Sequence, residues 1–137
     1  MTLLIDTNIL LDVIQRRTPH DAPAARVWKL VEERDVAGYV SAISFNNVFY
    51  IARKQVGNER ALDAVKLIRG VFRLVALDEG VVDRAIAITR GDFEDAIQAA
   101  AAAQVRADYI ITRNIADFAT MGVPAVTSDE FLAIYQS

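Results

Sequence analysis

Short apolar runs alternate with longer amphipathic segments along this sequence, and the alternation constrains the fold more than any other feature. Apolar runs bounded by turn residues are typical of strands buried on both faces of a parallel sheet, whereas the longer segments have helical spacing. We expect strands at residues 2–5, 36–42, 72–77, 108–112 and 123–126. The sequence therefore predicts a three-layer α/β fold, with a four- or five-stranded, mostly parallel sheet and helices on both faces.

Helices are expected between the strands, and capping residues indicate where several of them begin. We expect helices over residues 7–17, 24–34 and 93–105, a helix that ends at Gly57 followed by one capped by Asn58, and helices capped by Asp78 and Ser128. Ser44 is expected to cap the helix that follows the second strand, because serine is a favoured N-cap residue. At 137 residues, the chain is expected to form a single domain over residues 1–137.

The composition excludes several kinds of site. The chain has no cysteine, which excludes disulfides, thiolate catalysis and cysteine-bound zinc. It has one histidine, His20, so a Ser-His-Asp triad or a histidine zinc site would depend on that residue alone. The net charge of −3 argues against a generally basic nucleic-acid surface but allows a local basic patch. We find neither a secretory signal nor an apolar run of roughly 20 residues, so we expect a cytoplasmic protein without a membrane span.

Polar residues with oxygen donors follow the expected strands. In an open parallel sheet, ligands bind at the carboxyl ends of the strands near the point where the strand order reverses. The candidates at these positions are Asp6, Thr7 and Asn8 after the first strand, Asn47 after the second, Asp95 in the 93–105 helix, and Thr112, Asn114 and Asp117 after the fourth. Oxygen ligands suit Mg²⁺ or Mn²⁺, and such a cation can activate water and stabilise charge on a phosphoryl oxygen.

Each candidate also has a simpler structural interpretation. Asp6 or Thr7, Asp92 and Asn114 could act as helix caps, while Asn47 and Asp117 could be exposed polar residues. Asp6 is harder to explain in this way, because it directly follows an apolar strand where burial penalises an unpaired carboxylate. Asp95 is also difficult, because the rest of its alanine-rich helix is almost free of charge.

Three motifs stand out along the chain: Leu-Ile-Asp-Thr-Asn-Ile-Leu-Leu at 4–11, Asp-Phe-Glu-Asp-Ala at 92–96 and Tyr-Ile-Ile-Thr-Arg-Asn-Ile-Ala-Asp-Phe at 109–118. They resemble the motifs of PIN-domain nucleases, and in a chain of this length they resemble the VapC-type toxins of type II toxin–antitoxin pairs. They occur in the family's order and are followed by Ser-Asp-Glu-Phe-Leu at 128–132, so the resemblance covers essentially the whole chain.

This resemblance implies a five-stranded parallel sheet, Mg²⁺ or Mn²⁺ in an acidic pocket, and hydrolysis of RNA. It assigns Asp6 and Asp95 as metal ligands, with Asp117 or Asn114 in the fourth ligand position. It assigns Thr7, Asn8 and Thr112 as residues that support the ligands through hydrogen bonds. It also implies a cognate antitoxin protein and a homodimer as partners.

The chain departs from the family's pattern at one position. The second acid of the family falls in the helix after the second strand, where this chain has Asn47, and no acid lies between Tyr39 and Asn58. An amide accepts a hydrogen bond from a metal-bound water but contributes no charge. We therefore expect weaker metal binding and reduced activity, and we expect Asn47→Asp or Asn47→Glu to tighten binding.

Basic residues are the candidates for contact with RNA phosphates, although ordinary surface positions explain each of them individually. They are Arg16, Arg53, Lys54 and Arg113. The leading functional hypothesis is a metal-dependent ribonuclease toxin. The alternative is a catalytically weakened PIN-fold module that binds RNA or protein. A third hypothesis, a phosphoryl-transfer fold with Asp6 as phospho-acceptor, needs a lysine beyond a later strand, where the chain has Thr112-Arg113-Asn114.

Overall fold

A parallel sheet forms the centre of the protein. The computed structural model describes residues 1–89 and 91–136, and within them five strands form one parallel sheet in the order β3-β2-β1-β4-β5. The strands are β1 (Thr2–Ile5), β2 (Ala37–Ser41), β3 (Arg73–Val75), β4 (Tyr109–Ile111) and β5 (Ala125–Val126). The predicted parallel sheet is confirmed, in its five-stranded form.

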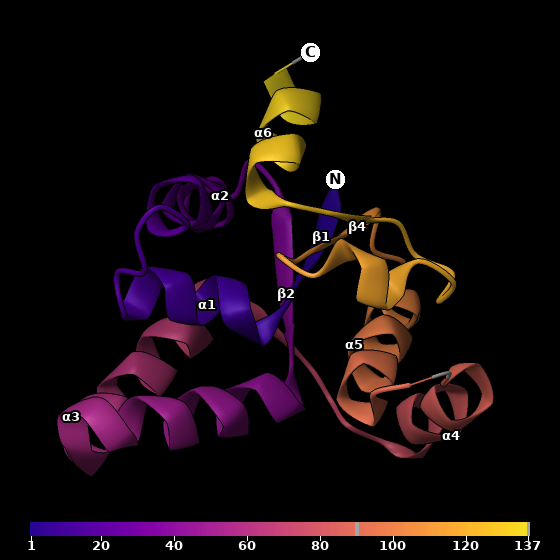
Figure 1. Ribbon diagram of the computed structural model, residues 1–137, viewed down its shortest axis with the longest axis horizontal. Coiled ribbons are helices and arrows are strands. Elements are labelled where there is room, and N and C mark those ends of the chain that lie inside the picture. Colours follow the sequence, from indigo (N-terminus) through magenta and orange to yellow (C-terminus); the bar gives the residue numbers. More distant parts are fainter. Residues whose placement is uncertain (90, 137) are drawn as a thin grey trace.

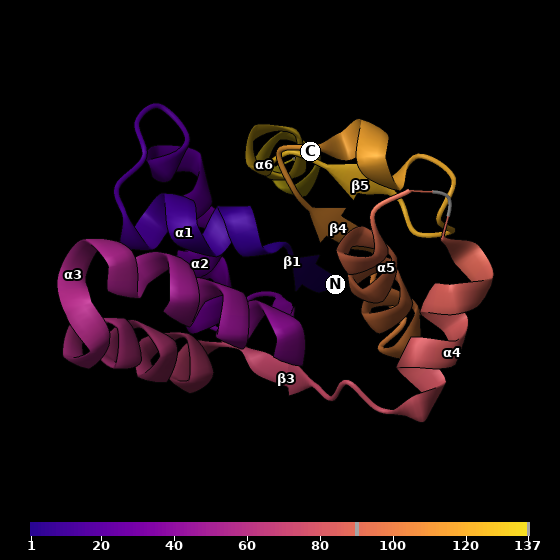
Figure 2. The same cartoon turned by 60° about the horizontal axis from the view of Figure 1, so that its bottom comes forward.

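Helices cover both faces of this sheet. The helices are α1 (Thr7–Ile14), α2 (Asp21–Glu32), α3 (Ala42–Val71), α4 (Glu79–Ile88), α5 (Phe93–Gln104), the 3₁₀ helix η1 (Ile115–Phe118) and α6 (Ser128–Gln136). Figures 1 and 2 show α1, α2 and α3 on one side of the strands and α4 and α5 on the other. The predicted three-layer arrangement is therefore confirmed. None of the helices in the described residues is long and apolar enough to cross a membrane.

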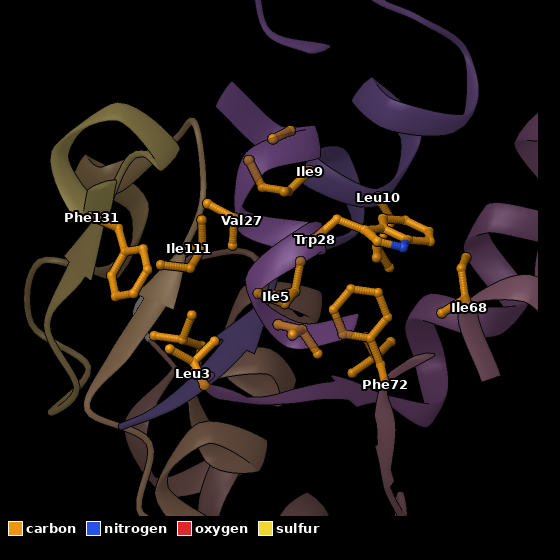
Figure 3. Packing of buried hydrophobic residues seen from close by; sticks show 14 of the residues in the cluster. Leu3, Ile5, Ile9, Leu10, Val27, Trp28, Ile68, Phe72, Ile111 and Phe131 are labelled. Atoms are coloured by element: carbon orange, nitrogen blue, oxygen red, sulfur yellow. The ribbon is translucent and has the colours of Figure 1, made fainter. Parts of the chain in front are cut away.

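The core has two parts because successive side chains of a strand point to opposite faces of the sheet. Leu3 and Ile5 of β1 pack with residues of α1 and α2, and Figure 3 shows this cluster. Leu4, between them, packs on the other face against Ala99, Ala101 and Ala102 of α5. These alanines are fully buried, which confirms that small side chains let α5 lie close to the sheet.

Several helix boundaries differ from those predicted. Helix α1 ends at Ile14 rather than at residue 17, and Arg16 takes a positive φ of 51°. Helix α2 begins at Asp21, so Pro23 lies within its first turn, where a backbone N–H has no partner inside the helix. Gly57 interrupts α3 with φ 84° and ψ 171°, a conformation that glycine adopts without a steric penalty. The predicted break between two helices at Gly57 is thus confirmed.

The predicted capping role of Ser44 is wrong. Helix α3 begins at Ala42, with Ser41 in the N-cap position, so Ser44 lies inside the first turn. Its side chain is fully buried, and its Oγ lies 2.8 Å from Oγ1 of Thr7 and accepts a hydrogen bond from Nε2 of Gln98 at 2.7 Å. A serine that could have closed a helix end instead joins α3 to two other helices.

Among the remaining candidate caps, Asp78 and Asp92 are confirmed, whereas Asn114 precedes η1 without a side-chain capping hydrogen bond and Ser128 is not the cap of α6. Asp78 and Asp92 cap α4 and α5, and each accepts a hydrogen bond from the backbone N–H three residues later. At the start of α6 the cap is Thr127 rather than Ser128. Thr127 Oγ1 accepts from the N–H of Glu130 at 3.1 Å, and the Glu130 carboxylate accepts from the N–H of Thr127 at 3.0 Å.

Candidate functional site

The candidate site lies where the connections from two neighbouring strands diverge. Strands β1 and β4 are adjacent in the sheet, but the chain leaves β1 toward β2 on one side and β4 toward β5 on the other. The crevice at the carboxyl ends of such a strand pair is the usual ligand site of an open parallel sheet. A pocket of about 440 Å³ is found here, lined by Asp6, Thr7, Asn8, Asn47, Tyr50, Ile51, Asp92, Glu94, Asp95, Asn114 and Asp117. The acids and amides predicted from the sequence therefore come together in one place.

Asp6 is fixed in orientation by hydrogen bonds to both carboxylate oxygens. Its side chain is buried, Oδ1 accepts from the N–H of Thr7 at 2.8 Å, and Oδ2 accepts from the hydroxyl of Thr112 at 2.8 Å. The Thr112 hydroxyl oxygen also accepts from the N–H of Asn114 at 3.0 Å, which leaves its proton for Asp6. Burial raises the pKa of Asp6, although these hydrogen bonds oppose the shift. Asp6 thus serves both as the cap of α1 and as a wall of the pocket.

Asp95 lies in the first turn of α5 among other carboxylates. Burial raises its pKa to about 6, with further contributions from the negative charges of Asp92, Asp6, Asp117 and Glu94. Burial, Asp6 and Asp92 raise the pKa of Glu94 as well. No lysine, arginine or histidine is among the residues that line the pocket in the described part of the chain. The carboxylates therefore repel one another without a cationic side chain in the pocket wall.

Removing the Asp95 charge is expected to stabilise the metal-free protein at neutral pH. The raised pKa means that the folded protein favours the protonated form of Asp95. The stability that this protonated side chain contributes is therefore fully present below about pH 4 and is lost as the pH rises through about 6. At pH 7.5 and in EDTA, Asp95→Asn should raise the free energy of unfolding by about 1 kcal/mol, allowing for solvent screening of this part-exposed side chain. Urea denaturation from pH 7.5 down to pH 4 should show the gain shrinking.

The matched control for this experiment is Asp63→Asn. Asp63 is an exposed aspartate on α3 outside the pocket, so its replacement removes the same charge without relieving repulsion among the pocket carboxylates. A destabilised Asp95→Asn protein at pH 7.5, or a gain equal to that of Asp63→Asn, would show that carboxylate repulsion does not act on Asp95.

The chemistry of the pocket fits a hard divalent cation. Its polar lining consists of carboxylates, amides and hydroxyls, and Mg²⁺ and Mn²⁺ prefer such oxygen donors. As their side chains are placed, no three histidine, cysteine, aspartate or glutamate residues among residues 1–89 and 91–136 form a group that could hold a metal ion. Asp6, Asp95 and Asp117 from η1 all line the pocket and are the predicted residues that could hold one.

A buried polar network joins α1, α3 and α5, three of the helices that line the pocket. Gln98 of α5 is fully buried, and its Nε2 donates to Ser44 of α3 and, at 3.4 Å, to Thr7 of α1. Its Oε1 has no hydrogen-bond partner. The sequence analysis did not predict this role of Gln98, although an amide inside an alanine-rich, otherwise apolar helix was a usable signal. The backbone N–H of Thr7 donates to Asp6, while the Thr7 hydroxyl belongs to this network.

Asn47 lines the pocket, as the motif comparison predicted, and it has an unexpected partner. Its Nδ2 donates a hydrogen bond of 2.6 Å to Oε1 of Glu94, which comes from the first turn of α5. Glu94 was not among the predicted site residues. A glutamate between Asp92 and Asp95 looks like part of a helix start, and its contact with α3 depends on tertiary packing.

None of the four predicted RNA-contact residues lines the acidic pocket. Arg113 makes two hydrogen bonds, of 2.9 and 3.1 Å, with the carboxylate of Asp12, which is fully buried. The guanidinium of Arg53 lies 4.9 Å from the ring centroid of Tyr50, a lining residue. Arg16 and Lys54 are exposed. Asp12 was missed because an acid inside a short amphipathic helix is usually solvated.

Several solved structures have a similar arrangement of helices and strands. A toxin–antitoxin complex from Klebsiella pneumoniae is 27% identical, with a TM-score of 0.70 over 92% of this chain and 97% of that chain. VapBC2 from Rickettsia felis, bound to a promoter DNA fragment, has 14% identity and a TM-score of 0.73, with 93% and 98% covered. VapC20 from Mycobacterium tuberculosis, which cleaves the sarcin–ricin loop, has 14% identity and a TM-score of 0.70, with 88% and 95% covered.

At the sequence level, none of the curated proteins matches this chain. A family model does: the model described as "PIN domain" matches residues 2–116, which include β1 to β4 and every strand end that contributes to the pocket. The chain therefore belongs to the PIN domain family.

Proposed function

We propose that this protein is a metal-dependent endoribonuclease that acts as the toxin of a bacterial toxin–antitoxin pair. The observation that carries the proposal is the convergence of Asp6, Asp95, Asp117 and Glu94 on one pocket lined by oxygen donors. Membership of a nuclease family and similarity to solved toxins support the same function. Asp6, Asp95 and Asp117 are the residues we assign to the cation.

The side chains divide the work of phosphodiester hydrolysis between them. A bound Mg²⁺ or Mn²⁺ would supply Lewis acidity and a local positive charge. Asp6, which follows β1, and Asp95 of α5 would hold the cation, and the hydrogen bonds from Thr7 and Thr112 fix the orientation of the Asp6 carboxylate. The amides of Asn8 and Asn114 line the same pocket and offer hydrogen bonds to phosphate oxygens or to ligating carboxylates.

Phosphate contacts outside the pocket are proposed for basic residues around its rim. Arg53 is a candidate because it lies over the ring of Tyr50, which is itself part of the pocket wall. Arg113 directly precedes the lining residue Asn114, and its positive charge opposes the rise in the pKa of Asp6 that burial causes, but its guanidinium is already paired with Asp12. Arg16 and Lys54 are the other two candidates. Such contacts would position an RNA strand without reading its sequence.

A second function, binding of RNA or protein without cleavage, is favoured by one observation only. Helix α3 presents the amide of Asn47 to the pocket where the family has an acid. The phosphoryl-transfer hypothesis with Asp6 as phospho-acceptor has less support, because the described residues that line the pocket include no lysine.

Two protein partners follow from the proposed function. The solved structures from Klebsiella pneumoniae and Rickettsia felis are toxin–antitoxin complexes, which supports a cognate antitoxin for this chain. A homodimer is a further proposal, based on the resemblance described above. Light scattering of the purified chain, alone and mixed with the product of an adjacent small gene, measures both assemblies.

Cleavage of RNA by the purified protein tests the proposal. We expect mixed RNA to be cut in Mg²⁺ or Mn²⁺ and to remain intact in EDTA. Retention of RNA on a filter without cleavage in either metal would favour the binding module instead. Cleavage that is equally fast in EDTA would contradict a metal-dependent mechanism.

A further inference from the structure

The pocket contains an acid that the sequence motif does not predict at that position. Asn47 on α3 occupies the position where the family has an acid, and Glu94 on α5 reaches across the pocket to contact it. The two residues are 47 positions apart in the sequence but 2.6 Å apart from Nδ2 to Oε1. A carboxylate is therefore present beside the position where α3 lacks one.

The contact accounts for an amide rather than an acid at residue 47. Asn47 donates a hydrogen bond to Glu94, whereas a carboxylate at residue 47 would face the Glu94 carboxylate with like charge at the same separation. The hydrogen bond occupies Oε1 of Glu94, and no hydrogen bond to Oε2 is found in the described residues. Asn47 thus holds the Glu94 side chain against the pocket wall and leaves one carboxylate oxygen available.

We propose that Glu94 supplies the negative charge that α3 lacks, as a cation-binding acid of this pocket, and that Asn47 is the residue that positions it. This inference rests on the proposed function insofar as that function requires a divalent cation. It names a residue that the motif comparison does not assign. It also changes the expectation that Asn47→Glu tightens cation binding. With the Glu94 carboxylate beside it, a glutamate at residue 47 adds repulsion between two negative charges, so Asn47→Glu alone should not tighten binding.

A simpler interpretation of Glu94 is that it only favours the start of α5. Acids in the first turn of a helix interact favourably with the helix dipole, and Glu94 is exposed. That role needs no contact with α3 and no free oxygen in the pocket, and it affects helix stability rather than cation affinity. The two interpretations therefore separate in a binding measurement.

The test is calorimetric titration of metal-free protein with Mn²⁺, without RNA. Glu94→Gln should weaken Mn²⁺ binding by about tenfold or more. Loss of a residue that only supports a ligand typically lowers metal affinity by about 10- to 100-fold, and loss of a charged ligand should cost at least as much. The double variant Asn47→Glu with Glu94→Gln exchanges acid and amide across the same contact and should recover most of the lost affinity. Glu59→Gln, which removes one exposed carboxylate from α3 outside the pocket, should bind like the parent protein.

Three outcomes would overturn the inference. Equal affinity of Glu94→Gln and Glu59→Gln would show that Glu94 does not bind the cation. A weakened Glu94→Gln protein that the folded double variant fails to rescue would show that residues 47 and 94 are not interchangeable positions for one acid.

A parent protein that binds no Mn²⁺ would remove the inference together with the metal assignment. A parent that binds Mn²⁺ but does not cut RNA would refute only the proposed function, so the two failures are distinguishable. Circular dichroism verifies that each variant is folded.

Discussion

Asp6→Asn is expected to abolish metal-dependent RNA cleavage while leaving the protein folded. Asp6 is the most buried carboxylate of the pocket. Its two oxygens accept hydrogen bonds from Thr7 and Thr112, so the carboxylate is held in one orientation. Replacing it with an amide removes a full charge next to the cation, and we expect a loss of at least about 100-fold in cleavage rate. The measurement is the rate of cleavage of a fluorescent RNA in Mn²⁺.

The same substitution has a second, smaller consequence for stability. Asp6→Asn removes the free-energy cost of burying a charge. However, if the new amide N–H pointed toward the Thr112 hydroxyl, the hydroxyl oxygen would already be accepting a hydrogen bond from the N–H of Asn114, so the amide would be poorly satisfied there. Metal-free Asp6→Asn should therefore gain less stability than Asp95→Asn. The exposed control Asp63→Asn should cleave RNA at the parent's rate, and an Asp6→Asn protein that also does so would remove Asp6 from the catalytic site.

Asp12→Ala is expected to cause the largest loss of stability among the charged residues considered. Asp12 is fully buried, accepts two hydrogen bonds from Arg113 and lies 3.9 Å from Arg17, so its removal leaves two part-buried guanidinium groups without this partner. Breaking a buried ion pair from one side typically costs 3–5 kcal/mol, and because both arginines reach solvent we expect about 2–3 kcal/mol. Urea denaturation at pH 7 measures this loss.

Two further variants separate charge from shape at this position. Asp12→Asn keeps the size and one oxygen acceptor and should lose less stability than Asp12→Ala. Asp63→Ala, at an exposed position of α3, should change stability by no more than about 0.5 kcal/mol. If Asp12→Ala unfolded at the same urea concentration as the parent, the pairing of Asp12 with Arg113 would be energetically unimportant.

The sheet and the pocket were predictable because they depend on features local in the sequence. The strand at residues 2–5 was visible as an apolar run, and its end placed Asp6 at the carboxyl edge of the sheet. Since parallel strands end at one edge, Asp6 and Thr112 were expected at the same edge, and they meet there because β1 and β4 are adjacent in the sheet. Asp95 stood out as a charge in an alanine-rich helix, and it does line the pocket.

The residues that escaped prediction make contacts between distant segments. Ser44 has the local features of a helix cap, but α3 begins two residues earlier and packing turns Ser44 toward Thr7 and Gln98. The partners of Asp12 and Glu94 lie 101 and 47 positions away in the chain. The periodicity of a single helix contains no information about which helix will lie opposite, so these pairs emerge only from the folded arrangement.

Anomalous diffraction from crystals soaked in Mn²⁺ tests most directly whether the carboxylate pocket is a cation site. We expect one manganese peak in the pocket between β1 and α5, within ligand distance of Asp6 and Asp95, with Glu94 or Asp117 completing the set of carboxylates. Asp95→Asn crystals soaked in the same way should show a weaker peak or none. A pocket without a peak at saturating Mn²⁺, or a peak only elsewhere on the protein, would contradict the assignment of this pocket as the metal centre.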